Sequence, residues 1–370
     1  MRSRIAVAFL FLAGWTSALP AQGARWTLKE TLRIGGAESG PGMFVQTRSI
    51  DADSKGRILV YDRQTQDIRM FAPDGKFIRT IGRVGSGPGE MRNAEGMVIA
   101  RDGRIWVRDA ANARFTVFNA EGEPEKSWTM KFCWSQGMWH PQPDRQGRII
   151  DYDCVVPVGG SRARTDAVVA YHTDMSKVDT LWTRPECGTR ELSEASTWIQ
   201  RSEKRTSYTS IPFAPSPIGA LGPSGEVWCA PNSARYEVTR LIGGAKDTVR
   251  FSRNVTPVPV TKAERDSIVG VFDAKGPSGL DFDRIPKTKP AIQLISVDDQ
   301  GRPWIRRMNA EGMVSFDIYS PDGKPVATTD LGPYRTMTYL PFVVRGDHVY
   351  MVVLDQDDVQ HVARFQIERR

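Results

Sequence analysis

The chain has 370 residues, of which 40% are apolar and 25% charged, with a formal net charge of +7. This apolar content supports a substantial core and excludes global disorder. The charge is modest for the length, and no Lys/Arg block of the nucleic-acid-binding kind appears, so we expect no nucleic-acid partner. Length alone is compatible with two average domains or with one all-β ring.

The first segment has the features of an export signal. Met1–Arg4 is a short basic start, and Ile5–Ala13 is an apolar run too short to span a bilayer as a stable helix. Small residues precede a plausible cleavage point after Ala21. We therefore predict a signal peptide over residues 1–21 and an extracytoplasmic mature chain, 22–370, either periplasmic or secreted, without stable membrane insertion. The alternative is an uncleaved anchor.

The stretch that follows Gly56 predicts a β-meander. Arg57–Asp62 and Asp67–Ala72 alternate apolar and polar residues, and a Pro-Asp-Gly turn leads to a third run over Lys76–Gly82. The same pattern recurs over Arg104–Trp128. The glycine-rich loop after the third run is expected to be a crossover between units rather than a phosphate loop, because it opens no helix and lacks Lys-Ser/Thr.

A glycine in the turn between the first and second strands of each unit sets the number of units. These glycines are Gly56, Gly103, Gly147, Gly225, Gly301 and Gly346. Their separations of 47, 44, 78, 76 and 45 residues fit four-stranded propeller blades, with insertions at residues 184–217 and 254–290 in the two long intervals. The expected blades are Ser49–Gly82, Gly96–Phe132, Gly137–Thr183, Ile218–Arg253, Ile292–Leu331 and a sixth from Tyr339.

The sixth blade has room for only three strands before the chain ends. An alternating run near the N-terminus, Arg25–Ile34, supplies a fourth, so we expect it to close the ring. In the second insertion, Thr261 and Glu264 form a capping box at the start of a short helix. The predicted fold is all-β: one six-bladed β-propeller of four-stranded blades, closed by the N-terminal strand, with one short helix in an insertion. Two unrelated β domains are the alternative.

Two motifs resemble a known repeat family. The segments Ile81–Met91, which reads Ile-Gly-Arg-Val-Gly-Ser-Gly-Pro-Gly-Glu-Met, and Asp102–Arg114 look like NHL repeats. The whole mature chain resembles exported bacterial six-bladed propellers of that kind, although the fourth unit has Cys229–Asn232 where the pattern has an Asp. The resemblance implies the fold. It leaves the function open, because NHL-type propellers include binding scaffolds, sensors, amidating lyases and relatives of lactonases.

Four cysteines in an exported chain suggest two disulfides, for which three connectivities exist. Cys133 follows an outermost strand and Cys154 ends the second strand of the next unit; Cys187 and Cys229 stand in the same relation one unit later. Because these strand ends lie on one face of the ring, we predict the pairs Cys133–Cys154 and Cys187–Cys229. A zinc site is the weaker alternative, since there is no Cys-x-x-Cys spacing.

Three carboxylates at second-strand ends, Asp62, Asp109 and Asp355, could converge on a central divalent metal such as calcium. The structural alternative, that each accepts hydrogen bonds from its own turn backbone, is favoured. We therefore expect no cofactor. The four histidines are scattered and no Gly-x-Ser-x-Gly elbow occurs, so the sequence identifies no catalytic residue.

The two insertions leave fourth strands and therefore share one face of the ring with the second-strand ends. Several arginines come to this face: Arg63, Arg108, Arg162, Arg164, Arg235, Arg306 and Arg307. Because arginine presents a planar fork of donors that suits carboxylate and phosphate groups, we predict that this face binds a small anionic ligand or a protein partner. Arg108 and Arg306 are the first choices. Ordinary solvated arginines are the alternative, and the competing function is a metal-dependent lactonase-like hydrolase or a lyase that uses the central channel.

Overall fold

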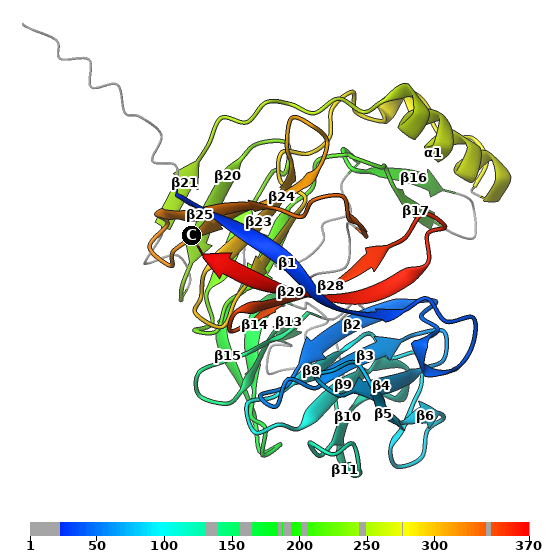
Figure 1. Ribbon diagram of the computed structural model, residues 1–370, viewed down its shortest axis with the longest axis vertical. Coiled ribbons are helices and arrows are strands. Elements are labelled where there is room, and N and C mark those ends of the chain that lie inside the picture. Colours follow the sequence, from blue (N-terminus) through cyan, green and yellow to red (C-terminus); the bar gives the residue numbers. More distant parts are fainter. Residues whose placement is uncertain are drawn as a thin grey trace, which may run out of the picture.

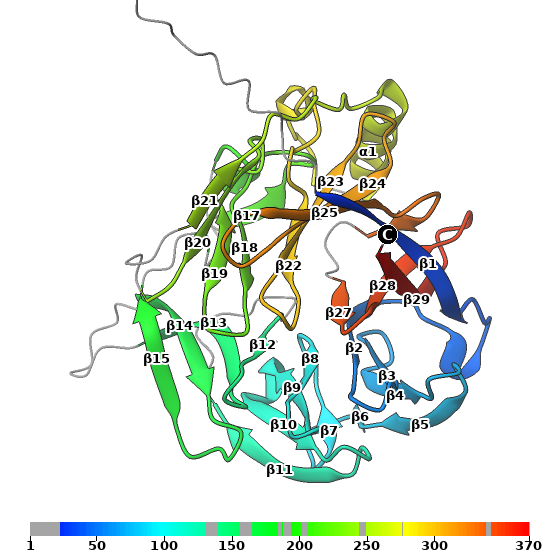
Figure 2. The same ribbon diagram turned by 60° about the vertical axis from the view of Figure 1, so that its left-hand side comes forward.

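Four-stranded antiparallel sheets follow one another around a ring (Figures 1 and 2). The computed structural model describes residues 23–130, 140–155, 165–183, 187, 194–201, 206–243, 249–275, 277–337 and 342–369. Blade one contains β2 (Thr47–Ala52), β3 (Ile58–Asp62), β4 (Asp67–Phe71) and β5 (Phe77–Ile81). Blade two contains β8 (Met97–Ile99), β9 (Ile105–Asp109), β10 (Arg114–Phe118) and β11 (Pro124–Thr129).

The next three blades repeat this order. Blade three contains β12 (Gln142–Pro143), β13 (Ile149–Val155), β14 (Thr165–Tyr171) and β15 (Val178–Thr183). Blade four contains β18 (Ile218–Leu221), β19 (Val227–Ala230), β20 (Glu237–Leu241) and β21 (Val249–Ser252). Blade five contains β22 (Leu294–Val297), β23 (Pro303–Met308), β24 (Val314–Tyr319) and β25 (Pro325–Asp330).

The N-terminal strand completes blade six, which confirms the predicted ring closure. Blade six contains β27 (Val343–Arg345), β28 (His348–Leu354), β29 (Gln360–Arg369) and β1 (Ala24–Gly35), with β26 (Arg335–Thr336) paired to the end of β28. β1 pairs with β29 in antiparallel register from Trp26↔Arg369 to Gly35↔His361. Its first residues also pair in parallel with β25, so that blades five and six share one continuous sheet. The first and last strands of the ring are therefore hydrogen-bonded rather than left as open edges.

The turns between first and second strands share a motif, Asp-x-x-Gly-Arg, in blades one, three and five. In blade five, Asp298 Oδ1 accepts from the backbone N–H of Gln300 and of Arg302, and its Oδ2 pairs with the Arg302 guanidinium at 2.6 Å. Gly301 has a φ of 81°, a conformation that favours glycine. This turn explains why the glycine spacing counted the blades correctly. We call the side of the ring formed by these turns the turn face, and the opposite side, where second strands end and blades are joined, the insertion face.

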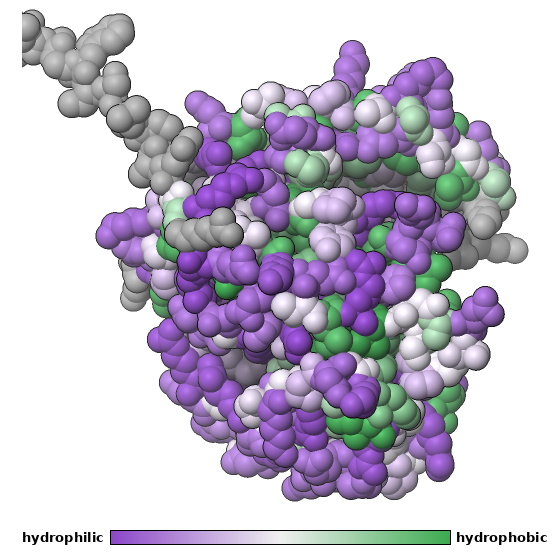
Figure 3. All heavy atoms as spheres, in the orientation of Figure 1, coloured by the Kyte–Doolittle hydropathy of each residue, from purple (hydrophilic) through white to green (hydrophobic). Residues whose placement is uncertain are grey.

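Apolar residues pack between neighbouring blades. Six clusters of buried hydrophobic residues each join two adjacent blades, and the cluster between blades six and one closes the circle. Trp106, Trp228 and Trp304 occupy the same position, three residues after the turn glycine, and are fully buried. Because the apolar faces of the strands are buried between blades, hydrophilic residues cover most of the surface in the view of Figure 3. Truncation of one such tryptophan to alanine costs about 3–5 kcal/mol in a typical core.

The two insertions form one structural unit, which we call the insertion cap. It contains the hairpin β16 (Thr197–Arg201) and β17 (Thr206–Ser210) and the helix α1 (Lys262–Lys275). Trp198 of the first insertion packs against Phe272 and Phe282 of the second, and its indole N–H donates to the Asp281 carbonyl at 2.9 Å. The predicted capping box is present at the start of α1, where the Thr261 N–H donates to the Glu264 carboxylate at 2.9 Å and the Glu264 N–H donates to the Thr261 hydroxyl.

One of the two predicted disulfides is confirmed. Cys187 and Cys229 are bonded and close a loop of 42 residues, which the chain-entropy model values at about 4 kcal/mol. Cys133 lies outside the described residues, so its pairing with Cys154 stays a prediction. Among the residues that the structure describes, no helix is long and apolar enough to cross a membrane.

Several short elements lie in the connections between strands. They are the paired strands β6 (Arg83–Val84) and β7 (Glu90–Met91) of the glycine-rich crossover and the 3-10 turns η1 (Gly40–Gly42), η2 (Ala110–Asn112) and η3 (Phe282–Arg284).

Candidate functional site

The three carboxylates at second-strand ends are each bonded to local groups. Asp62 accepts from the backbone N–H groups of Val45, Gln46 and Gln64. Asp109 accepts from the N–H of Arg92 at 2.8 Å and pairs with Arg114 at 3.2 Å. Asp355 accepts from the N–H groups of Asp357 and Val359 and from His361. Each carboxylate thus ties a loop to a strand end, although the backbone donor to Asp109 comes from the preceding crossover rather than from its own turn. No group of three or more metal-ligating side chains occurs in the described ranges.

Arg108 is fully buried between blades two and three. Its Nε lies 3.0 Å from Glu95 Oε2, its Nη1 donates to Asp151 at 2.8 Å, and its Nη2 lies 4.0 Å from Asp153. Burial alone would lower the pKa of the Arg108 guanidinium, but the charges of Asp151 and Asp153 hold that pKa above its ordinary value. Arg108 therefore holds two blades together, and its side chain is not exposed at the channel mouth.

Arg306 occupies the equivalent position in blade five but has different surroundings. Its side chain is 4% exposed, and its Nη1 donates to the Met337 carbonyl at 3.0 Å, in the crossover from blade five to blade six. In the part of the chain that the structure describes, no carboxylate forms an ion pair with it, and its buried Nε has no acceptor. Burial lowers the pKa of the Arg306 guanidinium to about 10, so the group is still a cation near neutral pH.

The neighbouring arginines of blades four and five share one carboxylate. Arg307 Nε donates to Asp317 at 2.8 Å, and the exposed Arg253 pairs with the other oxygen of Asp317 at 3.0 Å. Burial lowers the pKa of Arg307, but its hydrogen bond to Asp317 more than offsets this, and the net effect is a raised pKa. Arg307 and Arg253 therefore lie with Asp317 on the blade-four side of β23, whereas Arg306 points to the other side of the strand, toward blade six.

The other predicted ligand-binding arginines are not brought to this group. Arg63 donates to the Asn93 side chain between blades one and two, and Arg235 is exposed beyond the second strand of blade four. Arg162 and Arg164 lie outside the described residues. Of the predicted set, Arg306 and Arg307 are neighbours on β23 but point to opposite sides of the sheet. Arg307 is joined there by Arg253, which the sequence did not suggest. Arg253 directly follows a fourth strand, and that position was not considered.

The insertion cap borders a small cavity on the same face. The cavity has a volume of about 130 Å³ and is lined by Phe213 of the first insertion, by prolines of both insertions and by Met308 of β23. A cavity of this volume holds only a few atoms, so it is too small to enclose a metabolite-sized ligand.

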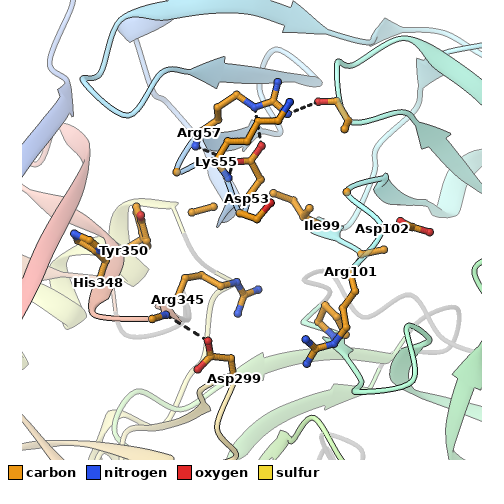
Figure 4. A pocket seen from close by; sticks show the side chains of 18 of the residues that line it. Asp53, Lys55, Arg57, Ile99, Arg101, Asp102, Asp299, Arg345, His348 and Tyr350 are labelled. Carbon is orange, nitrogen blue, oxygen red and sulfur yellow. Dashed lines mark hydrogen bonds and ion pairs between the residues drawn. The ribbon is translucent and has the colours of Figure 1, made fainter.

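A larger cavity, which the sequence did not predict, opens on the turn face. Its volume is about 610 Å³, and the turns of blades one, two and six line it (Figure 4). The signal that could have found it is the basic residue carried by these turns, Lys55, Arg101 and Arg345. The predicted binding face, which carries the long insertions, is the opposite one.

Comparison with known proteins supports the fold. Residues 40–144 match the family model DUF5128, described as a 6-bladed beta-propeller. A putative exported protein from Bacteroides fragilis is similar over 95% of this chain and 98% of its own, with 13% identity and a TM-score of 0.50. A member of the DUF4221 family from Bacteroides vulgatus covers 94% of this chain and 100% of its own, at 9% identity and a TM-score of 0.48.

An inactive virginiamycin B lyase from Staphylococcus aureus is also similar, over 92% of this chain and 99% of its own, at 12% identity and a TM-score of 0.40. No curated protein matches the chain. Identities this low indicate the fold alone and carry no information on a ligand or a reaction. Together with the ring of sheets, the matched model establishes a six-bladed β-propeller.

Proposed function

We propose that this chain is an exported, NHL-like propeller that binds an anionic ligand on its insertion face, where the Arg306 guanidinium takes the negative charge. The observation that carries the proposal is the burial of Arg306 without a carboxylate partner among the described residues. A guanidinium taken out of water loses several kcal/mol of hydration unless a counter-charge and hydrogen-bond acceptors replace it. A bound carboxylate or phosphate would supply both.

Blade two provides the comparison that gives this observation weight. The backbone N–H of Glu95 donates to the Arg108 carbonyl at 3.0 Å, and that of Gln293 donates to the Arg306 carbonyl at 2.8 Å. Glu95 and Gln293 each lie eight residues before the turn glycine, so they are equivalent. Where blade two has a carboxylate beside the arginine, blade five has a neutral amide whose buried carbonyl oxygen also lacks a partner.

The positive charge available to an anion at this position is that of Arg306 itself. Arg307 and Arg253 share Asp317 on the other side of β23, where Asp330 also interacts with Arg307, so those groups compensate one another. Positive potential at the mouth of a site raises the rate at which anions arrive and stabilises them once bound.

Export rests on two features of this chain. The predicted signal peptide precedes the propeller, and the Cys187–Cys229 bond is of a type that persists in oxidising compartments. A protein of the same fold from Bacteroides fragilis is also described as a putative exported protein.

The test is a binding screen of the mature chain, 22–370, against small carboxylates, phosphates and sulfates at low and moderate salt. Arg306→Met keeps the apolar stem and removes the fork, and Arg306→Lys keeps only the charge. A charge-assisted hydrogen bond is worth roughly 1.5–3 kcal/mol, so Arg306→Met should weaken binding by about tenfold to a hundredfold. Arg306→Lys should recover part of it.

Arg250→Gln is the matched control, because Arg250 is exposed on the outer strand of blade four and makes no ion pair in the described chain. Equal affinities for the unchanged chain and for Arg306→Met would overturn the proposal. The proposal invokes no cofactor. The competing hydrolase or lyase requires a bound divalent ion, and elemental analysis of the purified protein distinguishes the two.

A further inference from the structure

The turn face contains a second candidate site, independent of the insertion face. We call the cavity of about 610 Å³ the turn-face basin; it is lined by residues 52–57 of blade one, 99–103 of blade two and 345–346 of blade six, with further contributions from blades three and five. Small-molecule sites typically occupy 300–1,000 Å³. The basin is therefore large enough for a metabolite-sized ligand, whereas the cavity beside the insertion cap is not.

Two arginines project into the basin with donors to spare. Arg101 donates from Nε to the Asp144 carbonyl and forms no ion pair in the described part of the chain. Arg345 is anchored through Nη2 to the buried Asp51 at 2.8 Å, and 27% of its side chain remains exposed. Their guanidinium groups point toward the same part of the basin (Figure 4).

Several other charged groups around the basin are paired with one another. Asp53 accepts from the backbone and the guanidinium of Arg57, while Asp102 accepts from Arg104. Lys55 and Arg57 both pair with Glu121. Asp299 also lines the basin; its Oδ2 accepts from the Gly346 N–H at 3.4 Å, and its buried Oδ1 has no partner among the described residues. Arg101 and the free donors of Arg345 are therefore the groups open to an anion, with Asp299 as a nearby negative charge.

The walls add apolar surface and hydrogen-bonding groups. Ile99, Ala100 and Pro143 present apolar atoms beside the two arginines. Burial lowers the pKa of His348 at the rim, so this ring is neutral near pH 7 and offers one donor and one acceptor. A ligand that fits combines a doubly charged anionic end with a short body that is partly apolar and partly hydroxylated.

We infer that the turn-face basin binds a small organic dianion, a phosphomonoester or a dicarboxylate, through the paired guanidinium groups of Arg101 and Arg345. Each guanidinium offers a planar fork that suits two oxygens of a phosphate or carboxylate. The anchoring of Arg345 by Asp51 fixes one fork before the ligand arrives, which reduces the entropy lost on binding. The inference stands whether or not Arg306 binds an anion, because the two groups lie on opposite faces of the ring.

The experiment is isothermal titration of the mature chain with glycerol phosphate and, separately, with succinate, at low salt. Titrations use both the unchanged chain and the Arg306→Met chain, so that the insertion face cannot supply the signal. Binding of either probe in both backgrounds is the expected result, and the better probe identifies the ligand class. Absence of binding by both probes would overturn the inference.

Variants locate the binding. Arg101→Gln removes a cation without leaving a carboxylate unpaired, and it should lower affinity by about tenfold or more. Arg345→Lys keeps a positive charge beside Asp51 and removes the fork, so a smaller loss is expected with the fold intact. Arg250→Gln should bind as the unchanged chain does. If Arg101→Gln and Arg250→Gln bind the probe equally well, the basin is not the site.

Discussion

Blades two and five carry the same two residues on their second strands, a tryptophan and an arginine two positions later, and surround the arginine differently. Trp106 and Trp304 are both fully buried and pack between blades. Arg108 has Glu95 and Asp151 within 3.0 Å. Arg306 has the Met337 carbonyl and, in the described chain, no carboxylate. The same repeat position therefore stabilises an interface in one blade and leaves an unpaired charge in the other.

The difference has two sources. The residue eight positions before the turn glycine is Glu95 in blade two and Gln293 in blade five. The following blade contributes Asp151 and Asp153 beside Arg108, but its equivalent positions in blade six are Tyr350 and Val352. A repeat unit thus fixes the position of an arginine, while its own crossover and the next blade decide whether the charge is compensated. An uncompensated position in such a ring is a candidate binding site.

The largest expected effect comes from breaking the compensated arrangement. Arg108→Met would leave Glu95 and Asp151 as buried carboxylates without their cation, which typically costs about 3–5 kcal/mol. Urea unfolding of the mature chain measures this loss. Arg104→Met, in the same blade, removes partly exposed pairs with Asp102 and Glu125 and should cost under about 1 kcal/mol. Similar losses in the two variants would show that Arg108 does not hold the blades together.

A smaller change, this time an increase in stability, is expected when blade five receives the acid that blade two has beside its arginine. Gln293→Glu would place a carboxylate where Glu95 lies in blade two, and a hydrogen bond to a charged group is worth about 1.5–3 kcal/mol. The free energy of unfolding should rise by an amount in that range, and anion binding on the insertion face should be lost. Urea unfolding and the binding screen test both consequences. Higher stability with unchanged anion affinity would separate Arg306 from the ligand.

Removal of the uncompensated charge should be nearly neutral or stabilising. Arg306→Met loses the bond to Met337 but also removes a buried cation, in contrast to Arg108→Met. The pKa of Arg306 is lowered to about 10, well below its ordinary value, so above pH 10 the unfolded chain holds this proton more tightly than the folded chain. The stability of the unchanged chain therefore increases as the pH rises above about 10 toward the ordinary pKa of arginine.

The destabilisation caused by burying the Arg306 cation is therefore at its full value below pH 10. It disappears as the pH approaches the pKa that arginine has in the unfolded chain. The difference in unfolding free energy between Arg306→Met and the unchanged chain should be constant from pH 7 to about pH 9. Above pH 10 the unchanged chain should gain stability relative to the variant. Guanidinium-free thermal unfolding across this range measures it. A strongly destabilised Arg306→Met at pH 7 would mean that the charge is compensated.

Local patterns were sufficient to predict the fold. The turn glycines lie where the chain must reverse with positive φ, and the strand alternation follows from burial between blades, so both signals are contained in short windows of sequence. The run Arg25–Ile34 was predicted to close the ring because the last blade lacked a fourth strand, and it is the strand β1 (Ala24–Gly35) of the structure. The glycine-rich crossover, expected to carry no helix, contains only the short pair β6 and β7.

The candidate site was only partly predictable, because the burial of an arginine depends on residues far away in the sequence. Arg108 and Asp151 are 43 positions apart and meet only when two blades pack. The tryptophan and arginine that the two second strands share do not distinguish Arg108 from Arg306. An alignment of the repeats on their turn glycines places Glu95 opposite Gln293, and this contrast is the sequence signal that separates the two arginines. The turn-face basin required the ring itself, since five blades contribute to it.

The smallest expected effect tests whether loss of one acid is enough to convert blade two into a copy of blade five. Glu95→Gln would remove the carboxylate 3.0 Å from Arg108 Nε but leave the hydrogen bond to Asp151 at 2.8 Å, so we expect a loss of about 1 kcal/mol in urea unfolding. Because Asp151 and Asp153 still compensate the cation, no new anion affinity should appear when the variant is titrated in the Arg306→Met background. A loss as large as that of Arg108→Met would show that Glu95 is the dominant partner. A gain of anion binding would show that the carboxylates of the following blade contribute little, and that the crossover residue alone decides between an interface and a binding site.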